Sequence, residues 1–326
     1  MKAEILKILK KAEEYVSGQQ LCEQLGVSRT AVWKAIRQLE EEGYVIEAVR
    51  NKGYRLVEDA DVLTVAELRS VLDTKWLGQE VDYFYETDST NNRARDAAEK
   101  GASHGYLAVA DSQTAGKGRR GRVWNSPHGT DIFMSFLMRP SFGPSQASML
   151  TLVAGMAVVK GVQKATGLNV MIKWPNDAVV NGKKICGILT EMSTEEDTIR
   201  YVVVGIGINV NAREFPEEIR DKATSLKLEL GRSVKRSEVI QAVAESFEEY
   251  YAVYEKTCDM SGLQAAYNEM LANMDKEVCV LDPREEYRGK ALGIDEEGCL
   301  LVEKENGELI HVLSGEVSVR GIYGYV

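Results

Sequence analysis

Residues 19–56 read QQLCEQLGVSRTAVWKAIRQLEEEGYVIEAVRNKGYRL, and they predict two helices followed by a hairpin. A short helix over 19–25 is expected to end at Gly26, the residue type that favours a left-handed helix cap. Ser28 then offers an N-cap oxygen to a second helix, expected over 29–42. The two helices are separated by only three residues, so the sequence predicts a helix–turn–helix.

The same stretch ends in two extended runs, 44–49 and 54–57, which flank a turn and indicate a β-hairpin. A helix–turn–helix followed by a hairpin is the winged form of a DNA-binding module, whose second helix enters the major groove. The expected DNA contacts are Ser28, Arg29, Thr30, Trp33, Lys34 and Arg37 on the helix and Arg50, Lys52 and Arg55 on the wing. The alternative is a helical adaptor with a solvated charged face, although such a face rarely displays a tryptophan among cations.

The whole chain has 326 residues and a formal net charge of −10, but the charge is unevenly spread. Residues 1–57 hold ten lysines and arginines against eight acids, whereas the remainder holds 30 against 42. This difference in sign indicates different partners for the two parts. The modest excess in the first part predicts weak DNA binding by one copy, so a useful operator needs two.

Other bulk features exclude several classes of protein. The longest apolar run, 149–159, is too short to span a bilayer, and the first residues do not resemble a secretory signal. We therefore expect a cytoplasmic protein with no membrane partner. The five cysteines and three histidines are widely spaced, which indicates isolated thiols and no transition-metal site.

Three segments follow from these patterns and give an α+β fold class. They are a winged helix–turn–helix over 1–62, a mixed α/β domain over 63–274 and a small β-barrel over 275–326. The expected central strands are 107–110, 132–138, 171–172, 185–191 and 201–208, and the expected central helices are 91–100, 147–166 and 238–256. Ser237 is the expected N-cap of the last of these helices.

A basic loop, TAGKGRRGRVW, occupies residues 114–124 of this acidic chain. It is not a P-loop, because Gly118 stands where Ser or Thr is needed. Its GxGxxG letters do not open a helix, because three arginines and a proline-containing run follow them. An exposed patch for nucleic acid is one alternative. A flexible clamp is favoured, because glycines allow close backbone approach and arginines offer forked donors to carboxylate or phosphate oxygens.

Further motifs surround this loop in the sequence. KWPND (173–177) ends a strand with a polar turn, and GKKICGILTE (182–191) brings Lys184 into an extended run. In VVVGIGINVN (202–211), two glycines remove side chains from one strand face and so create a flat slot for a ligand. TDSTNN (87–92) places polar side chains at a helix N-terminus, which suits polar ligand atoms.

Together the motifs DSTNN, SQTAGKGRRGRVW, KWPND, GKKICGIL, GIGINVN and ATSL (223–226) resemble those of biotin–protein ligases, in the family's order. The resemblance covers essentially the whole chain and is to the bifunctional type that also represses the biotin operon. It implies a class II synthetase-like central domain and an SH3-like C-terminal barrel. It also implies that biotin and ATP, with Mg²⁺, form biotinoyl-5′-AMP, whose biotinyl group passes to a lysine of a biotin carboxyl carrier protein.

The resemblance also assigns roles to residues of this chain. The implied biotin-binding residues are Ser89, Thr90, Gln113, Gly116, Lys117, Arg119, Arg120, Gly121, Lys184, Gly187, Leu189, Gly205 and Gly207. The implied ATP and adenylate contacts are Lys117, Arg119, Arg122, Trp124, Asn176, Asp177, Lys184 and Asn209, with Mg²⁺ at Asp177 and Asn209. Lys184, Arg119 and Asp177 are the implied catalytic residues. The family usually writes the loop GRGRRGR; here Lys117, a point charge without the bidentate fork, replaces the first arginine.

Chemistry agrees with this assignment. Joining a carboxylate to the α-phosphorus of ATP brings two anions together, so nearby cations lower the barrier and no general base is needed. A closed loop would also protect the acyl-adenylate from water, and Arg119→Gly is expected to release it. Adenylate that orders surface loops would favour dimers and thereby operator binding.

Three other functions stay open at this stage. The chain could sense biotin-like or acidic ligands without catalysis, which a test for pyrophosphate release would show. It could be a lipoate or octanoyl transferase of related fold, which competition with lipoate would show. It could also be a stand-alone ligase with a vestigial winged helix, which a gel shift against its own biotin-gene promoter would decide.

Overall fold

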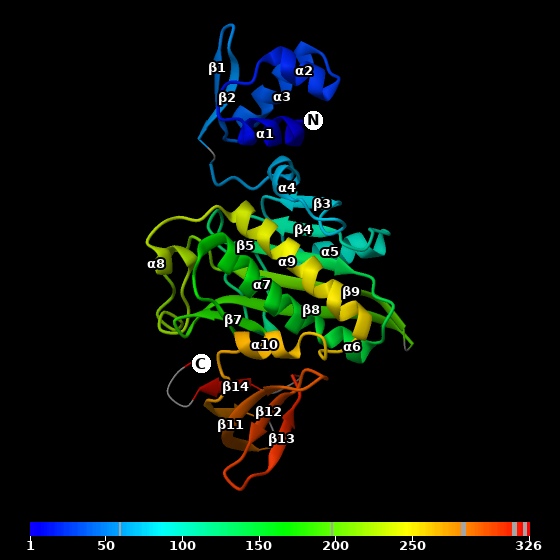
Figure 1. Cartoon of the computed structure of the whole chain (residues 1–326), viewed down its shortest axis with the longest axis vertical. Coiled ribbons are helices and arrows are strands. Elements are labelled where there is room, and N and C mark those ends of the chain that lie inside the picture. The colour runs from blue at the N-terminus through cyan, green and yellow to red at the C-terminus, as the bar shows by residue number, and fades with distance from the viewer. Residues whose placement is uncertain (59, 197, 282–284, 315–317, 322–324) are drawn as a thin grey trace.

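The chain folds into three parts stacked along one axis, with the N-terminal part at one end and the C-terminal sheet at the other (Figure 1). The structure, a computed structural model, describes residues 1–58, 60–196, 198–281, 285–314, 318–321 and 325–326. The elements of the first part are α1 (Lys2–Lys11), α2 (Gly18–Leu25), α3 (Arg29–Glu41), β1 (Val45–Val49) and β2 (Gly53–Glu58). Strands β1 and β2 pair antiparallel as the expected hairpin.

The predicted helix ends of this first part are confirmed. Gly26 adopts the left-handed conformation with φ of 65° at the end of α2, and the Ser28 hydroxyl accepts the backbone N–H of Ala31 at the start of α3. The apolar face of α3, with Val32, Ile36 and Leu39, is buried against α1 and α2. The sequence signal was strong here because caps and the apolar stripe are both local features.

The central part is built on a seven-stranded sheet of order β3-β4-β5-β9-β8-β7-β6. Only β3 and β4 run parallel, and every other neighbouring pair is antiparallel. The strands are β3 (Val81–Phe84), β4 (Leu107–Ala110), β5 (Ile132–Met138), β6 (Met171–Lys173), β7 (Asp177–Val180), β8 (Lys183–Glu195) and β9 (Thr198–Ile208). The helices are α4 (Val65–Val71), α5 (Thr90–Glu99), α6 (Pro144–Ser148), α7 (Leu150–Thr166), α8 (Leu226–Leu230), α9 (Arg236–Thr257) and α10 (Gln264–Met270).

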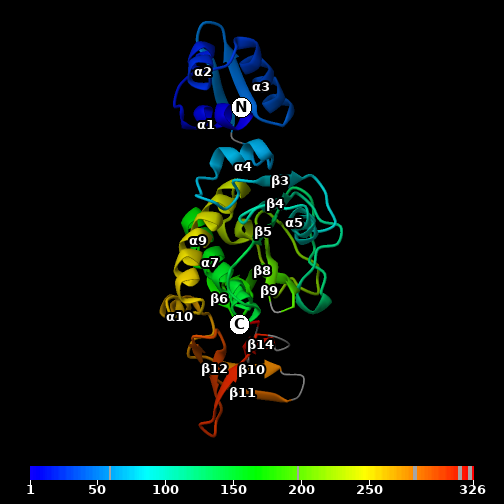
Figure 2. The same ribbon diagram turned by 90° about the vertical axis from the view of Figure 1, so that its right-hand side faces the viewer.

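Helices cover the two faces of this sheet unequally. The long helices α7 and α9 pack on one face and enclose the main apolar core, whereas α5 lies on the other (Figure 2). On the α5 side, the glycines of β9 are approached closely by the side chains of Asn91 and Trp124. The helical stretch Pro144–Thr166 in the main core is long and apolar enough, by length and composition alone, to cross a membrane. Its most apolar 18 residues are 72% buried inside the fold, as a core helix would be.

Two details of the predicted central helices are wrong. The helix expected over 147–166 is divided into α6 and α7, which meet at Met149. Ser237 does not cap the last long helix, because α9 begins at Arg236 with Lys235 as its N-cap residue. The Ser237 hydroxyl instead donates to the buried carboxylate of Glu67, a partner 170 positions earlier that no local pattern announces.

The C-terminal part, where the sequence predicted a small β-barrel, contains five short strands among its described residues. They are β10 (Glu277–Leu281), β11 (Glu286–Ile294), β12 (Leu300–Glu303), β13 (Leu309–Val312) and β14 (Ser318–Gly321), in antiparallel order β13-β12-β11-β10-β14. The stretch predicted to form this barrel, 275–326, includes residues 282–284, 315–317 and 322–324, which lie outside the described part of the chain. The apolar side chains of this sheet join the main core through Val278, Ile294 and Leu300. The boundaries 1–62, 63–274 and 275–326 stay predictions.

Candidate active site and DNA-binding face

A cavity of about 870 Å³ opens on the α5 side of the sheet, at the ends of β8 and β9. Its walls come from the N-terminus of α5, the basic loop, the KWPND turn, the two central strands and the C-terminal sheet. Positive side chains gather around it: Lys117, Arg119, Arg120, Arg122, Lys173, Lys184, Lys222 and Arg320. The acids of the wall are fewer: Asp131, Asp177, Glu214, Glu218 and Asp221. The cavity is therefore shaped and charged for an anionic ligand.

The first turn of α5 forms the polar end of the cavity. Thr90 donates from its backbone N–H, 2.9 Å, to the side-chain oxygen of Gln113. The Ser135 hydroxyl in β5 donates 2.7 Å to the side-chain oxygen of Asn91 and lies within hydrogen-bond distance, 2.8 Å, of the Thr90 hydroxyl. Ser89 is the N-cap residue of α5, but its side chain makes no capping bond. These bonds fix donors and acceptors around one small volume, as recognition of a polar ring requires.

The glycines of β8 and β9 form the flat wall that the sequence predicted. Gly187 of β8 pairs with Gly207 of β9, and Leu189 of β8 pairs with Gly205 of β9. The four residues therefore lie side by side on the same face of these two neighbouring strands. The Trp124 indole lies against this wall, because a Cβ on Gly207 would come within 2.6 Å of the ring. Only glycine permits this close approach, and a flat ligand can use the same surface.

The basic loop is an ordered hairpin that leans over the cavity. Lys117 and Val123 form a β-bridge across it, and Arg120 at its tip adopts φ of 60°. One Arg119 nitrogen donates 2.9 Å to the side-chain oxygen of Asn176, and another donates to the backbone carbonyl of Ser314 in the C-terminal part. Burial lowers the pKa of the Arg119 guanidinium. The loop thus contacts both neighbouring walls of the cavity through Arg119.

A chain of charges lies beneath this loop. The Lys184 ammonium is 2.6 Å from the Asp177 carboxylate, which also accepts the hydroxyl of Tyr325. The Tyr325 ring covers the Lys173 ammonium, which lies 3.9 Å from the ring centre. Burial raises the pKa of Asp177, but the charges of Lys184 and Lys173 outweigh it and hold that pKa below its usual value. Burial lowers the pKa of Lys173 to about 8.

The two asparagines of the predicted ATP site have backbone partners. The side-chain amide of Asn176 donates 3.0 Å to the carbonyl of Ile188. That of Asn209 donates 3.1 Å to the carbonyl of Thr224. The side-chain oxygen of Asn176 accepts the bond from Arg119. Within the described part of the chain, no three His, Cys, Asp or Glu side chains gather as a metal site.

Of the residues that the resemblance assigned to the ligands, all but two line this one cavity. The exceptions are Gly116, which is buried beneath the backbone of Trp124, and Gly121, which lies at the exposed outer turn of the loop. Their expected biotin contacts, like the other individual roles, stay predictions.

Asn91, which the TDSTNN motif had placed at the helix N-terminus, also lines the cavity, whereas sequence reasoning assigned no role to Phe133, Lys173, Arg320 and Tyr325 of its wall. Lys173 lies inside the KWPND motif and was open to inference. The last two belong to the C-terminal part and carry no local signal.

The first part of the chain displays the expected DNA-binding face. Ser28, Arg29, Thr30, Lys34, Arg37, Arg50 and Lys52 are exposed, and Trp33 is 53% exposed. Arg55 differs, because it pairs with Glu47 at 2.8 Å and stacks on the ring of Tyr15. Its charge is therefore partly used within the hairpin.

A mixed sheet with a cationic cavity, preceded by a winged helix and followed by a small antiparallel sheet, defines a ligase of the biotin or lipoate class that carries a DNA-binding domain. Family models agree part by part. Residues 2–55 match the HTH domain, residues 83–209 the biotin/lipoate A/B protein ligase family, and residues 274–320 the biotin protein ligase C-terminal domain.

Full-length relatives narrow this class. The chain is 42% identical over 310 residues to the bifunctional ligase/repressor BirA of Bacillus subtilis, covering 94% of this chain and 95% of that protein. It is 30% identical over 307 residues to the protein of the same name from Escherichia coli, covering 94% of each. The solved biotin protein ligase of Aquifex aeolicus in complex with biotin and ATP superposes with a TM-score of 0.66 at 35% identity, covering 74% of this chain and 99% of that one. The chain belongs to the family of bifunctional biotin ligase/repressors.

Proposed function

We propose that this chain joins biotin and ATP into biotinoyl-5′-AMP and passes the biotinyl group to a lysine of a biotin carboxyl carrier protein. While it holds the adenylate, it represses transcription of the biotin operon. The observation that carries the proposal is the cavity itself. It has a polar end at α5 for a ureido ring, a glycine wall for a flat bicycle and tail, and a ring of cations for a carboxylate and a phosphate.

In the first step, a biotin carboxylate oxygen attacks the α-phosphorus of ATP while the bond to the bridging oxygen of the β-phosphate breaks, and pyrophosphate leaves. The nucleophile is already ionised, so the chain has to overcome charge repulsion rather than remove a proton. Cations of the basic loop and β8 line the cavity. We propose that Arg119, Lys117 and Lys184 neutralise both acids and that Arg122 adds charge at the phosphates. Positioned cations of this kind supply about 2.7–4 kcal/mol each to a transition state.

In the second step, the acceptor amine attacks the biotinyl carbonyl carbon, the bond to the phosphate oxygen breaks, and AMP leaves. The amine has to lose a proton, and the carboxylate that we propose for this step is Asp177, which lines the cavity and pairs with Lys184. Its lowered pKa makes it a weak base. The site therefore supports a role in orienting the incoming ammonium group better than a role in removing its proton.

Mg²⁺ would enter this site with the phosphates of ATP. Such ions are usually held by one or two carboxylates together with substrate oxygens. The Asp177 carboxylate and the side-chain oxygen of Asn209 are the protein oxygens we propose for it. The ion would supply further charge neutralisation at the phosphates, and it would compete for Asp177 with the Tyr325 hydroxyl, which donates to the same carboxylate.

The closed loop is the device that we propose to retain the adenylate. Arg119 fastens the loop to Asn176 and to Ser314, so Arg119→Gly removes both contacts and frees the loop. We expect this variant to release biotinoyl-5′-AMP and to biotinylate bystander proteins. Strict selectivity for the carrier protein in this variant would contradict the retaining role.

For repression, we propose that the adenylate-bound chain forms a homodimer whose two winged helices bind two operator half-sites. The exposed face of α3 and the wing support this role. We further propose that the chain works in the cytoplasm, where its carrier protein and its DNA are found. Sedimentation with and without biotin and MgATP measures the dimer, and a gel shift against the chain's own biotin-gene promoter measures DNA binding.

The deciding experiment for the ligase function is mass spectrometry of the chain after incubation with biotin and MgATP. Bound biotinoyl-5′-AMP and released pyrophosphate are expected. If pyrophosphate is absent, the chain only senses its ligand. If lipoate competes as well as biotin, the slot is built for a longer acyl tail.

A further inference from the structure

Glu67 in α4 is a carboxylate that no step of the proposed chemistry uses, and it is completely buried. Buried glutamates are rare unless they are paired, because removing a charge from water is costly. This one lies outside the cavity, where the N-terminal part meets the ligase part. Its surroundings therefore call for an explanation other than catalysis.

The partners of Glu67 come from both sides of this junction. From the DNA-binding part, the Lys10 ammonium lies 2.6 Å from one carboxylate oxygen, and the Tyr44 hydroxyl donates 2.8 Å to the other. From the start of α9 in the ligase part, the Ser237 hydroxyl donates at 2.6 Å and the Lys235 ammonium lies at 3.3 Å. Burial raises the pKa of Glu67, but these bonds and charges outweigh it and lower that pKa, so the group is an anion.

The helix that carries Glu67 is itself shared between the two parts. Ala66 packs in the apolar core of the DNA-binding part, whereas Leu63 and Leu68 pack in the main core of the ligase part. Rotation of one part against the other would therefore pull α4 out of one of the two cores. It would also strip a buried carboxylate of partners, which is strongly destabilising because it leaves a buried charge uncompensated.

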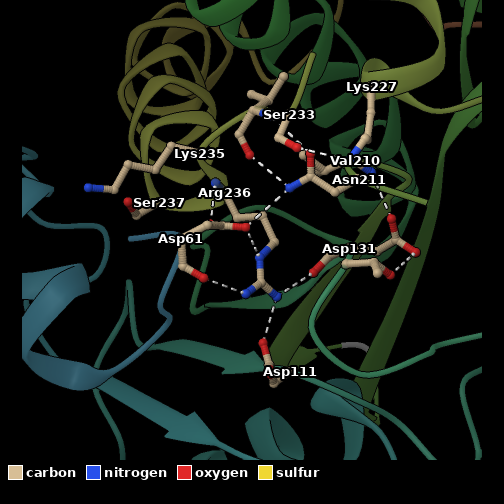
Figure 3. Close-up of polar contacts among 12 residues, drawn as sticks. Asp61, Asp111, Asp131, Val210, Asn211, Lys227, Ser233, Lys235, Arg236 and Ser237 are labelled. Atoms are coloured by element: carbon tan, nitrogen blue, oxygen red, sulfur yellow. Dashed lines mark hydrogen bonds and ion pairs between the residues drawn. The ribbon is translucent and has the colours of Figure 1, made fainter. Parts of the chain in front are cut away.

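A second set of bonds ties the preceding linker to the same end of α9. Arg236, which is 2% exposed, holds both carboxylate oxygens of Asp61, through its backbone N–H and its Nε, each at 2.9 Å. Its guanidinium also donates 2.6 Å to Asp111 and 3.3 Å to the carbonyl of Asp131 (Figure 3). Asn211 adds a 3.1 Å bond to Asp61. The linker is thus fixed to the ligase part immediately before α4 begins.

We propose that Glu67 is the lock that holds the DNA-binding domain in one orientation on the ligase domain, and that operator binding requires this orientation whereas biotin adenylation does not. The inference rests on the proposed function as a repressor. A dimer that binds two half-sites has to present its two recognition helices at one spacing and angle. Domains held in advance avoid the entropic cost of being ordered on the DNA.

The test uses the full-length chain with biotin and MgATP, and the operator that the wild-type chain protects in its own biotin-gene promoter. Glu67→Gln keeps the shape of the side chain and removes its charge, so the attraction of Lys10 and Lys235 to this side chain is lost. We expect its operator affinity to fall at least tenfold. Pyrophosphate release with biotin and MgATP should stay within twofold of wild type.

A spacing series separates a lock from a general loss of stability. Operators with one to three base pairs added or removed between the half-sites should bind wild type much more weakly than the natural spacing. Glu67→Gln should discriminate far less among them, because its DNA-binding domains can turn. Lys10→Met and Lys235→Met each remove one ion pair with Glu67, from opposite sides of the junction. Both variants should therefore reproduce this loss of discrimination.

Glu42→Gln is the matched control, since Glu42 pairs with Lys2, and both partners of this ion pair belong to the DNA-binding part. It should retain the spacing preference. The lock is overturned if folded Glu67→Gln keeps wild-type operator affinity and spacing preference, or if operator binding and adenylation fall together with the folded fraction. Should Glu67→Gln fold poorly, Ser237→Ala, which removes one neutral partner from the ligase side, has to show the same relaxed spacing. If the wild type itself does not bind its promoter, the repressor function fails instead.

Discussion

The ion pair of Lys184 and Asp177 offers a direct test of the adenylation step. The two groups are 2.6 Å apart, and their side chains are 24% and 10% exposed. Lys184→Met keeps a side chain of similar length and removes the charge. We expect kcat/KM for adenylation to fall about 10²–10³-fold, because one positioned donor contributes about 2.7–4 kcal/mol to the transition state.

The stability of the same variant should change by a separate amount. Removing Lys184 leaves Asp177 with the Tyr325 hydroxyl and the field of Lys173, so we expect a loss of about 1–3 kcal/mol in the free energy of unfolding. Adding Asp177→Asn removes the uncompensated charge. The double variant should therefore recover most of the stability and none of the adenylation rate.

Adenylation is measured as pyrophosphate release with biotin and MgATP, and transfer is measured separately with purified biotinoyl-5′-AMP and a carrier domain. Lys183→Met is the matched control, because Lys183 adjoins Lys184 in β8 but does not line the cavity. A loss smaller than tenfold, a loss confined to transfer, or an equal loss in the Lys183 variant would refute the electrostatic role of Lys184.

Four further outcomes follow from the structure. Gly207→Val should weaken biotin binding more than 100-fold in calorimetry, because even a Cβ there meets the Trp124 ring at 2.6 Å. Trp33→Ala should weaken operator binding at least tenfold in a gel shift, with unchanged pyrophosphate release, because Trp33 is 53% exposed on α3. Tyr325→Phe should lower KM for MgATP about two- to fivefold in steady-state kinetics, since its hydroxyl no longer competes for Asp177. The pKa of Asp88 is lowered to about 2, because bonds from Asn92 and the start of α5 outweigh the effect of its burial. The ionised Asp88 carboxylate therefore stabilises the fold fully above about pH 5, and this contribution is lost as the pH falls from about 4 to 2. In urea unfolding, Asp88→Asn should lose less stability on acidification than wild type does.

Each of these four predictions has a result that would count against it. Unchanged biotin affinity in Gly207→Val would mean that the glycine wall is not the biotin slot. Unchanged DNA binding in Trp33→Ala would remove α3 as the recognition helix. A raised KM in Tyr325→Phe would make the hydroxyl part of the ATP site. An acid response of Asp88→Asn identical to that of the wild type would show that this carboxyl does not control acid stability.

Much of the fold and most of the cavity wall could be predicted from the sequence, because the signals are local. Ser28 and Gly26 mark helix ends through bonds within a few residues. Strands β4 and β5 are apolar runs that end where the sequence predicted. The basic loop, the glycine pairs and Lys184 each lie within a short motif, and the sheet register then brings these motifs together at one end.

Other features depend on partners far apart in the chain, and only the tertiary structure decided them. Arg119 contacts Ser314, 195 positions away, and Tyr325 reaches Asp177, 148 positions away. Ser237 has the residue type of a helix cap, but the buried charge of Glu67 takes its hydroxyl instead. A cap bond is satisfied by neighbours in the chain, whereas a buried carboxylate draws donors from any element that packs around it. For this reason the sequence by itself determined the ligand-binding motifs, and packing alone decided how the C-terminal sheet closes the site and how the DNA-binding domain is held.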